Sequence, residues 1–122
     1  MGMYTEIVIK CSIKENLPES IVSVLHYLFN NGDEVAELPN HPFFKCSRWR
    51  AVGSCSSFYH IPWADSKYSE DYLFSRSDLK NYDNEIALFF DWLDPYIEEL
   101  TDKCVGWSWY EENDVPELVY KK

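Results

Sequence analysis

The clearest pattern in the chain is a helical period of apolar and polar residues between Asn81 and Leu100. One helical face of this stretch is apolar, at the spacings found in a helix that packs on a core, and the opposite face is polar and acidic. The apolar face contains Ile86, Phe89, Phe90, Leu93, Ile97 and Leu100, and the opposite face contains Asn84, Asp91, Asp94 and Glu98. The pattern predicts an amphipathic helix with one buried side and one acidic side exposed to solvent.

Polar residues at the start of this stretch are typical of a helix N-terminus. Asn81 can cap the helix, and Asp83 and Glu85 are favourable near the positive end of the helix dipole. Pro95 lies inside the pattern and removes one backbone hydrogen bond, to the carbonyl of Asp91. Because Pro95 falls on the solvent side, where water can replace the lost bond, we expect a helix kinked near Pro95 rather than two separate elements.

The N-terminal part of the chain predicts a strand followed by a helix. Residues 3–13 alternate between two sides and are rich in β-branched residues, which is typical of a half-buried strand. Pro18 then occupies a first helical position, with Glu19 in the first turn. Gly32 is placed to end this helix in a left-handed conformation. The apolar face of the predicted helix contains Ile21, Val24, Leu25 and Leu28.

The middle of the chain predicts strands separated by irregular segments. Residues 33–44 contain two prolines and no regular period, which indicates a loop. Residues 45–52 and 54–61 resemble two strands joined by a hairpin turn. Residues 62–70 are predicted to form a polar connection, and residues 71–79 a further strand.

The C-terminal part of the chain predicts two more strands. Residues 104–111 alternate, with Val105, Trp107 and Trp109 on one side, and residues 118–120 follow a proline as a short edge strand. Tryptophans can stack on a sugar or a base. Because Trp107 and Trp109 share a strand face with Val105, burial against the helices is the favoured interpretation.

The predicted element order is β-α-β-β-β-α-β, with a short last strand. Two helices on one face of a mainly antiparallel sheet would bury both apolar stripes together. A chain of 122 residues has the length of one domain. We therefore predict a single α+β domain over residues 1–122, with two helices packed on one face of a mainly antiparallel sheet in a loosely ferredoxin-like arrangement.

Negative charge is concentrated in the C-terminal part of the chain. The whole sequence has a formal net charge of −10, from 11 basic and 21 acidic residues. Residues 83–117 contain eleven acids and a single base, Lys103, and their net charge equals that of the whole chain. Because phosphates are bound mainly by lysine and arginine, direct binding to nucleic acid or to an anionic membrane is disfavoured. Clustered acids repel one another without helping folding, so their concentration indicates a function.

Cysteine usage and the N-terminal sequence indicate an intracellular protein. The four cysteines, Cys11, Cys46, Cys55 and Cys104, are scattered, and we expect them to be reduced and buried. The N-terminus does not combine a basic segment with an apolar one, and no apolar run approaches the ~18 residues of a membrane span. The expected location is the cytoplasm, away from the membrane.

Metal and cofactor chemistry have little support in the sequence. His41, Cys46, Cys55 and His60 are the metal-ligand candidates that lie near one another along the chain. A zinc site normally shows ligand pairs two to four residues apart, and the sequence has no such pair. We predict neither a metal nor a cofactor.

A small enzyme is the alternative interpretation of the middle of the chain. Arginine at 48 or 50, serine at 56 and 57, and glutamate at 111 or 112 follow an order that resembles the ADP-ribosyltransferase site. Cross-strand pairing of arginine with glutamate explains the same residues. In the enzyme interpretation, the cleft lies between residues 45–61 and the C-terminal strand, and it is lined by Arg48, Arg50, Tyr59, Trp109 and Glu111.

Several segments together resemble a family of small uncharacterised phage and prophage proteins. The segments are HPFF, RWR, SCSSFYH, KNYDNEI with FFDWLDPYI, and GWSWYEENDVPELVY, which extend over nearly the whole chain. The most specific parts are KNYDNEI and the tail Gly106…Tyr110-Glu111-Glu112…Pro116. The resemblance implies a phage or mobile-element accessory protein that acts inside a bacterial cell, and it assigns no catalytic residue.

The favoured hypothesis is a non-enzymatic protein–protein interaction module. Its acidic C-terminal third would dock on a basic surface of a host protein and could mimic the DNA backbone, so a nucleic-acid-binding host protein is the natural target. The predicted binding face consists of Asp91, Asp94, Glu98, Glu111 and Glu112. The alternatives are the small enzyme described above and a homodimer formed through exposed aromatic surface.

Overall fold

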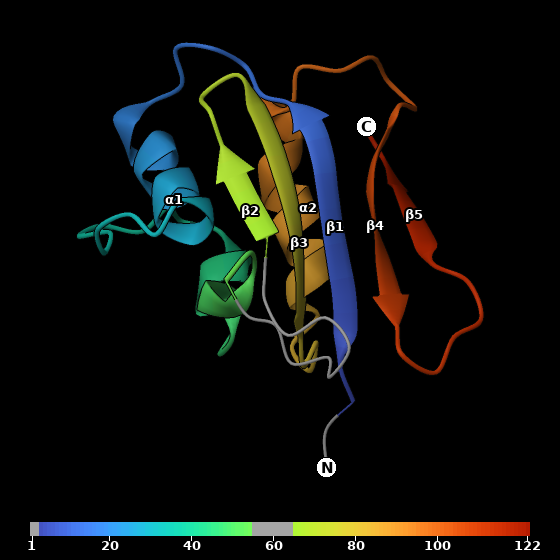
Figure 1. The fold of residues 1–122 in the computed structure, drawn as a ribbon. Coiled ribbons are helices and arrows are strands. Elements are labelled where there is room, and N and C mark those ends of the chain that lie inside the picture. Colours follow the sequence, from blue (N-terminus) through green and yellow to red (C-terminus); the bar gives the residue numbers. More distant parts are fainter. Residues whose placement is uncertain (1–2, 55–64) are drawn as a thin grey trace.

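The computed structural model describes residues 3–54 and 65–122 (Figure 1). The strands in these ranges are β1 (Thr5–Ser12), β2 (Asp65–Tyr68), β3 (Tyr72–Leu79), β4 (Cys104–Tyr110) and β5 (Glu117–Tyr120). The α-helices are α1 (Glu19–Phe29) and α2 (Glu85–Leu93). Three short 3₁₀ segments complete the described elements, namely η1 (Pro42–Lys45), η2 (Trp49–Ala51) and η3 (Asp94–Tyr96).

The strands form one antiparallel sheet in the order β2-β3-β1-β4-β5. Helix α1 joins β1 to β2 across β3, and α2 joins β3 to β4 across β1. Apolar residues of both helices share one core with the apolar side of β1, so both helices cover the same face of the sheet (Figure 1). The α+β, ferredoxin-like prediction is therefore confirmed, with β5 as an additional edge strand.

The core is built on β1, whose alternate residues are apolar and face the helices. Ile7, Ile9 and Cys11 of this strand have no solvent exposure. Beside them, aromatic rings from η1, η2 and α2 form a cluster in which neighbouring ring centroids lie 5.0 to 6.3 Å apart. The cluster contains Phe43, Phe44, Trp49, Phe89 and Trp92. Much of the aromatic content therefore stabilises the core through large buried areas.

The strand predicted over residues 45–52 is wrong, because this region contains the last residue of η1, a turn and the 3₁₀ segment η2. The side chain of His41 caps η1 by accepting a hydrogen bond from the backbone N–H of Phe43. Trp49 is buried and Arg50 is exposed, an alternation that a strand would also produce. The second predicted strand, over residues 54–61, lies outside the described residues apart from its first residue.

The predicted polar connection over residues 62–70 contains strand β2. One polar residue of this strand, Ser66, together with Ser75 and Ser77 of β3, anchors the turn that follows η2. The hydroxyl of Ser66 donates to the carbonyl of Gly53 at 2.7 Å and is hydrogen-bonded to Ser75 at 2.8 Å. The hydroxyl of Ser77 accepts the backbone N–H of Gly53 at 2.9 Å. Hydrogen bonds therefore hold this turn against the sheet, a role that packing of apolar side chains more often has.

The kinked helix predicted to reach Leu100 is wrong in its second half. Helix α2 ends at Leu93, and the proline lies in the 3₁₀ turn η3 that follows. The chain then becomes extended, and Ile97 forms an isolated β-bridge with Ile13. Ile97 is buried by this pairing, whereas the side chain of Leu100 is 85% exposed. The apolar spacing beyond Pro95 therefore does not belong to a helix.

The ends of α1 also differ from the prediction. Pro18 directly precedes the helix instead of being its first residue. Asn31, not Gly32, adopts the left-handed conformation, with φ of 54°. A glycine is needed at position 32 because the chain there passes close to the backbone of α1. A Cβ atom on Gly32 would lie 2.9 Å from the carbonyl oxygen of His26.

A β-bulge near the start of β4 changes which side chains face the helices. Trp107 pairs with Val8 of β1, which is buried but lies outside the core shared with the helices. Val105 is buried in that core, and Trp107 and Trp109 lie on the opposite face of the sheet. The prediction that the two tryptophans pack against the helices is therefore wrong. Cys104, at the start of β4, is exposed rather than buried.

Candidate interaction surface

Asp91 and Asp94, predicted to be free on the acidic side of the helix, are paired with the C-terminal lysines. Oδ2 of Asp91 lies 3.0 Å from Nε2 of His41, and Oδ1 of Asp91 lies 3.3 Å from Nζ of Lys122. The hydrogen bonds from His41 and Lys122 hold the pKa of Asp91 below its ordinary value. Oδ2 of Asp94 lies 3.1 Å from Nζ of Lys121. These two carboxylates therefore stabilise the C-terminus and are only partly available to a partner.

Glu98 and Glu111 lie near opposite ends of strand β1. The backbone N–H of Glu98 donates to the carbonyl of Ser12 at 2.8 Å, and that of Glu111 donates to the carbonyl of Tyr4 at 3.2 Å. Eight residue steps along a strand correspond to about 26 Å. Glu112 adjoins Glu111 in the turn that follows β4. The five carboxylates predicted to form one binding face are therefore dispersed over the molecule.

The hairpin formed by the end of β4, the following turn and β5 combines free acids with exposed apolar side chains. We call residues 109–120 the hairpin surface; it lies at one edge of the sheet (Figure 1). Its four acids are exposed and form no ion pair within the described part of the chain, namely Glu111, Glu112, Asp114 and Glu117. Five of the nine large hydrophobic residues exposed in that part also lie here, namely Trp109, Tyr110, Val115, Leu118 and Tyr120.

The residues of the predicted enzyme cleft do not form a shared site within the described residues. The guanidinium of Arg48 lies over the ring of Tyr82, at 4.9 Å from its centroid, and that of Arg50 lies over Trp49 at 4.5 Å. Trp109 lies on the face of the sheet away from the helices, and its Nε1 donates to the carbonyl of Asn113 at 2.9 Å.

Glu111 is engaged with the N-terminal end of the sheet, since its side chain accepts the backbone N–H of Tyr4 at 2.9 Å. The described contacts of Glu111 therefore include neither Arg48 nor Arg50. Tyr59, Ser56 and Ser57, which completed the predicted cleft, lie outside the described residues.

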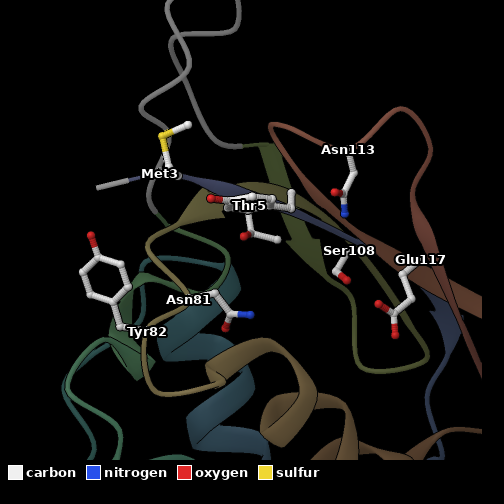
Figure 2. Close-up of a pocket in the computed structure, with 8 residues that line it drawn as sticks. Met3, Thr5, Asn81, Tyr82, Ser108, Asn113 and Glu117 are labelled. Atoms are coloured by element: carbon white, nitrogen blue, oxygen red, sulfur yellow. The ribbon is translucent and has the colours of Figure 1, made fainter. Parts of the chain in front are cut away.

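A cavity of about 530 Å³ opens beside the hairpin surface, on the helix side of the sheet (Figure 2). Three regions line it: the start of β1, the segment that precedes α2, and the hairpin. Its lining residues are Met3, Thr5, Asn81, Tyr82, Ser108, Tyr110, Asn113 and Glu117. The sequence pattern gave Asn81 only a capping role and did not single out Ser108 or Glu117. Thr5, Ser108 and Glu117 meet at the cavity because the strand order places β1 beside β4 and β4 beside β5.

The wall of this cavity is polar, and Glu117 supplies the one polar side chain in its described lining that can only accept hydrogen bonds. Thr5, Ser108 and Glu117 place oxygen atoms around it (Figure 2). Oδ1 of Asn81 accepts the backbone N–H of Ile86 at 3.0 Å, and the amide nitrogen of Asn81 points toward the cavity (Figure 2). Among residues 3–54 and 65–122, the lining contains one carboxylate, from Glu117, and no lysine, arginine or histidine. The one formal charge of the described lining is therefore negative, which suits a cationic ligand that donates a hydrogen bond to Glu117.

Two further features describe the chemistry available elsewhere. Within residues 3–54 and 65–122, no group of three or more His, Cys, Asp or Glu side chains has the arrangement of a metal site. In the same ranges, no helix has the length and apolar character needed to cross a membrane. The buried carboxylate of Glu85 accepts backbone N–H groups of Arg48 and Asp83 at 3.2 and 3.0 Å, which is a structural role at the start of α2.

Comparisons with protein-family models, curated proteins and solved structures find no match to this chain. Its function is therefore inferred from the geometry and charge of its own residues. Among the features described above, the hairpin surface and the adjoining cavity are the places where exposed apolar groups and unpaired acids occur together.

Proposed function

We propose that this chain is a protein–protein interaction module that binds a basic surface of a host protein through its hairpin surface. The supporting observation is the concentration, within residues 109–120, of five exposed large hydrophobic residues and four carboxylates that form no ion pair with the described residues. The hairpin includes the edge strand β5, which has no strand on its outer side in the described part of the fold. Trp109 and Leu118 lie on the face of the hairpin away from the helices and Tyr110 lies on the helix side, so in this proposal the partner contacts both faces of the hairpin at the sheet edge. Exposed apolar side chains bordered by charge are typical of an interaction site.

The two kinds of side chain have different roles in such an interface. Carboxylates attract a basic partner over distances near the Debye length and disfavour acidic partners, which mainly affects association rate and specificity. Aromatic and aliphatic side chains become buried on contact and supply most of the free energy of binding. Trp109, Tyr110 and Tyr120 are residues of the kind that dominate binding energies at protein interfaces.

The pairing of other acids supports this placement of the binding surface. Asp91 and Asp94 are compensated by Lys122 and Lys121, so they contribute less to the external field than their number suggests. The acids of the hairpin surface have no such compensation among the described residues. Their mutual repulsion costs folding free energy, which selection tolerates where a partner of opposite charge removes the cost on binding.

The partner class in this proposal is a nucleic-acid-binding protein of a bacterial host. A phosphate-binding groove presents clustered lysine and arginine side chains, which complement the acids of the hairpin surface. The resemblance of the sequence to phage and prophage proteins is consistent with a partner in the host cytoplasm. The proposal requires no catalysis and no cofactor.

The test is affinity capture from bacterial lysate with two matched variants. One variant changes Glu111, Glu112 and Asp114 to lysine, and the other changes Glu15, Asp33 and Glu37 to lysine. All six residues are exposed, and the two variants alter net charge equally. We expect the unmodified chain and the second variant to capture the same basic proteins, less strongly as salt rises, and the first variant to lose them.

Two outcomes would contradict the proposal. One is equal capture by both variants, or capture that is insensitive to salt, with circular dichroism showing that both variants are folded. The other is a homodimer of the unmodified chain in light scattering that the hairpin variant converts to a monomer, because the hairpin surface would then be the contact between two copies.

A further inference from the structure

We infer that the cavity beside the hairpin surface receives an arginine side chain of the basic partner. This inference rests on the proposed function and deepens it, since Ser108, Tyr110, Asn113 and Glu117 of the cavity wall all come from β4, β5 or the turn between them. A partner that docks on the hairpin would bring its side chains to the mouth of the cavity.

The charge of the cavity selects a cationic group. The carboxylate of Glu117 forms no ion pair or hydrogen bond within the described residues, and none of the described residues that line the cavity is basic. Glu111, Glu112 and Asp114 of the neighbouring turn add negative potential at this end of the sheet. An anionic ligand would meet repulsion here, whereas a cation would form a charge-assisted hydrogen bond with Glu117.

The arrangement of the acceptors favours guanidinium over ammonium. Thr5, Ser108 and Glu117 belong to three adjacent strands, so their oxygen atoms reach the cavity from different positions (Figure 2). Guanidinium has five N–H donors in a fixed plane and can reach several such acceptors at once. Ammonium has three donors at a single point and retains its hydration more strongly.

Aromatic walls favour the same group. Tyr82 and Tyr110 line the cavity and are 61% and 38% exposed, so part of each ring is accessible. Arginine stacks on aromatic rings by cation–π attraction. Arg48 already covers the ring of Tyr82 at 4.9 Å, so Tyr110 is the ring in the described lining that is available to an incoming arginine. The volume of about 530 Å³ lies within the range of small-ligand sites and accommodates an arginine side chain together with its backbone.

The test uses a small probe and therefore does not depend on the identity of the partner. Nα-acetyl-arginine methylamide, the corresponding lysine derivative and the neutral citrulline derivative are titrated into ¹⁵N-labelled protein and followed by two-dimensional NMR. We expect the arginine probe to shift the signals of Thr5, Asn81 and Ser108, and to bind several-fold more tightly than the other two probes. Citrulline matches arginine in shape without its charge, so it isolates the contribution of the charge.

Two single substitutions define the role of the carboxylate. We expect Glu117→Gln to weaken binding of the arginine probe about tenfold, since it removes one charge-assisted hydrogen bond. Glu37→Gln removes the same charge from an exposed residue outside the hairpin surface and the cavity lining, and it should leave binding nearly unchanged. Equal weakening by both substitutions, equal affinity for citrulline, or signal shifts confined to residues outside the cavity would each overturn the inference.

The inference and the proposed function fail separately. If the arginine probe does not bind in the cavity while reversal of the hairpin charges abolishes partner capture, the cavity inference is wrong and the proposed function stands. If the probe binds in the cavity while charge reversal leaves capture unchanged, the proposed function is wrong and the cavity remains an arginine site.

Discussion

Nζ of Lys121 lies 3.1 Å from Oδ2 of Asp94, which links the penultimate residue of the chain to the turn that follows α2. The two side chains are only 14% and 17% exposed. Oδ1 of Asp94 also accepts the backbone N–H of Lys122 at 3.0 Å. The backbone of Lys121 is paired with residues 102 and 103, directly before β4. Asp94 therefore fastens the C-terminal end of the β4–β5 unit to the helical layer.

Replacing Asp94 with alanine should destabilise the fold by about 1–3 kcal/mol, because it leaves a partly buried ammonium and a backbone N–H without their shared acceptor. The free energy of unfolding in urea, followed by tryptophan fluorescence, measures this loss. Glu37→Ala is the matched control, since Glu37 is exposed and its replacement should change stability by less than about 0.5 kcal/mol. Equal stability of the two variants would contradict the fastening role of Asp94.

The carboxylate of Asp83 makes the stability of the fold sensitive to acid. The backbone N–H and the hydroxyl of Ser47 donate to Oδ2 of Asp83 at 3.0 and 2.9 Å, and these bonds hold the pKa of Asp83 below its ordinary value. A carboxyl group with a lowered folded-state pKa contributes stability above its unfolded pKa of about 3.9. That contribution is lost as the pH falls through the lower folded-state pKa.

Asp83→Asn should therefore be less stable than the unmodified chain at pH 7, and the difference should disappear as the pH falls below the folded-state pKa. Denaturant unfolding at a series of pH values from 7 to 2 tests this dependence. Ser47→Ala should raise the pKa of Asp83 only in part, because the backbone N–H of residue 47 remains as a donor. A stability difference that stays constant over the whole pH range would be inconsistent with this explanation.

Regular apolar alternation made part of the fold predictable. Strand β1 alternates apart from the buried Val8 and forms the centre of the sheet, and the element order led to the correct fold class. Residues 45–52 show the same kind of alternation but form 3₁₀ segments, because Trp49 packs in an aromatic cluster rather than on a strand face. Strand β2 has almost no apolar signal, since Ser66 is held by hydrogen bonds. The spacing of apolar residues along the chain does not by itself distinguish a strand from a 3₁₀ segment, and it does not reveal a polar strand such as β2.

The candidate site was less predictable than the fold, because charge pairing depends on contacts distant in sequence. The acidic stretch over residues 83–117 contains one base, yet Lys121 and Lys122, just beyond it, return to pair with Asp94 and Asp91. The face of Trp109 depended on a bulge beside Gly106, and an isolated glycine in a strand was the one local signal of it. The remaining unpaired acids could be located only when the strand order was known.

Gly106 is the position in β4 where a side chain is least tolerable. A Cβ atom there would lie 2.1 Å from the carbonyl oxygen of Val8 and 3.1 Å from Cζ of Phe90. We expect Gly106→Ala to cost about 1–3 kcal/mol, because either strand pairing or the packing of α2 must shift. Thermal and urea unfolding measure the effect. Ser108→Ala, at the next position of β4 facing the helices, is the control and should be nearly neutral; equal loss in both variants would contradict the steric explanation.

The cysteines Cys11 and Cys104 should differ strongly in reactivity in the folded protein. Cys11 is buried on β1, and burial together with the nearby carboxylate of Glu99 raises its pKa to about 12. At pH 8 such a thiol is ionised in only about one molecule in 10,000, and the thiolate is the reactive form. Cys104 is exposed at the start of β4.

Brief treatment of the native protein with iodoacetamide at pH 8 should therefore alkylate Cys104 and leave Cys11 unmodified, as measured by mass spectrometry of the proteolytic peptides. The same treatment in urea is the control, because unfolding exposes both thiols and gives them similar pKa values, so both peptides should then be modified to a similar extent. Modification of Cys11 at the rate of Cys104 in the native protein would show that β1 opens to solvent, which is incompatible with its place at the centre of the sheet.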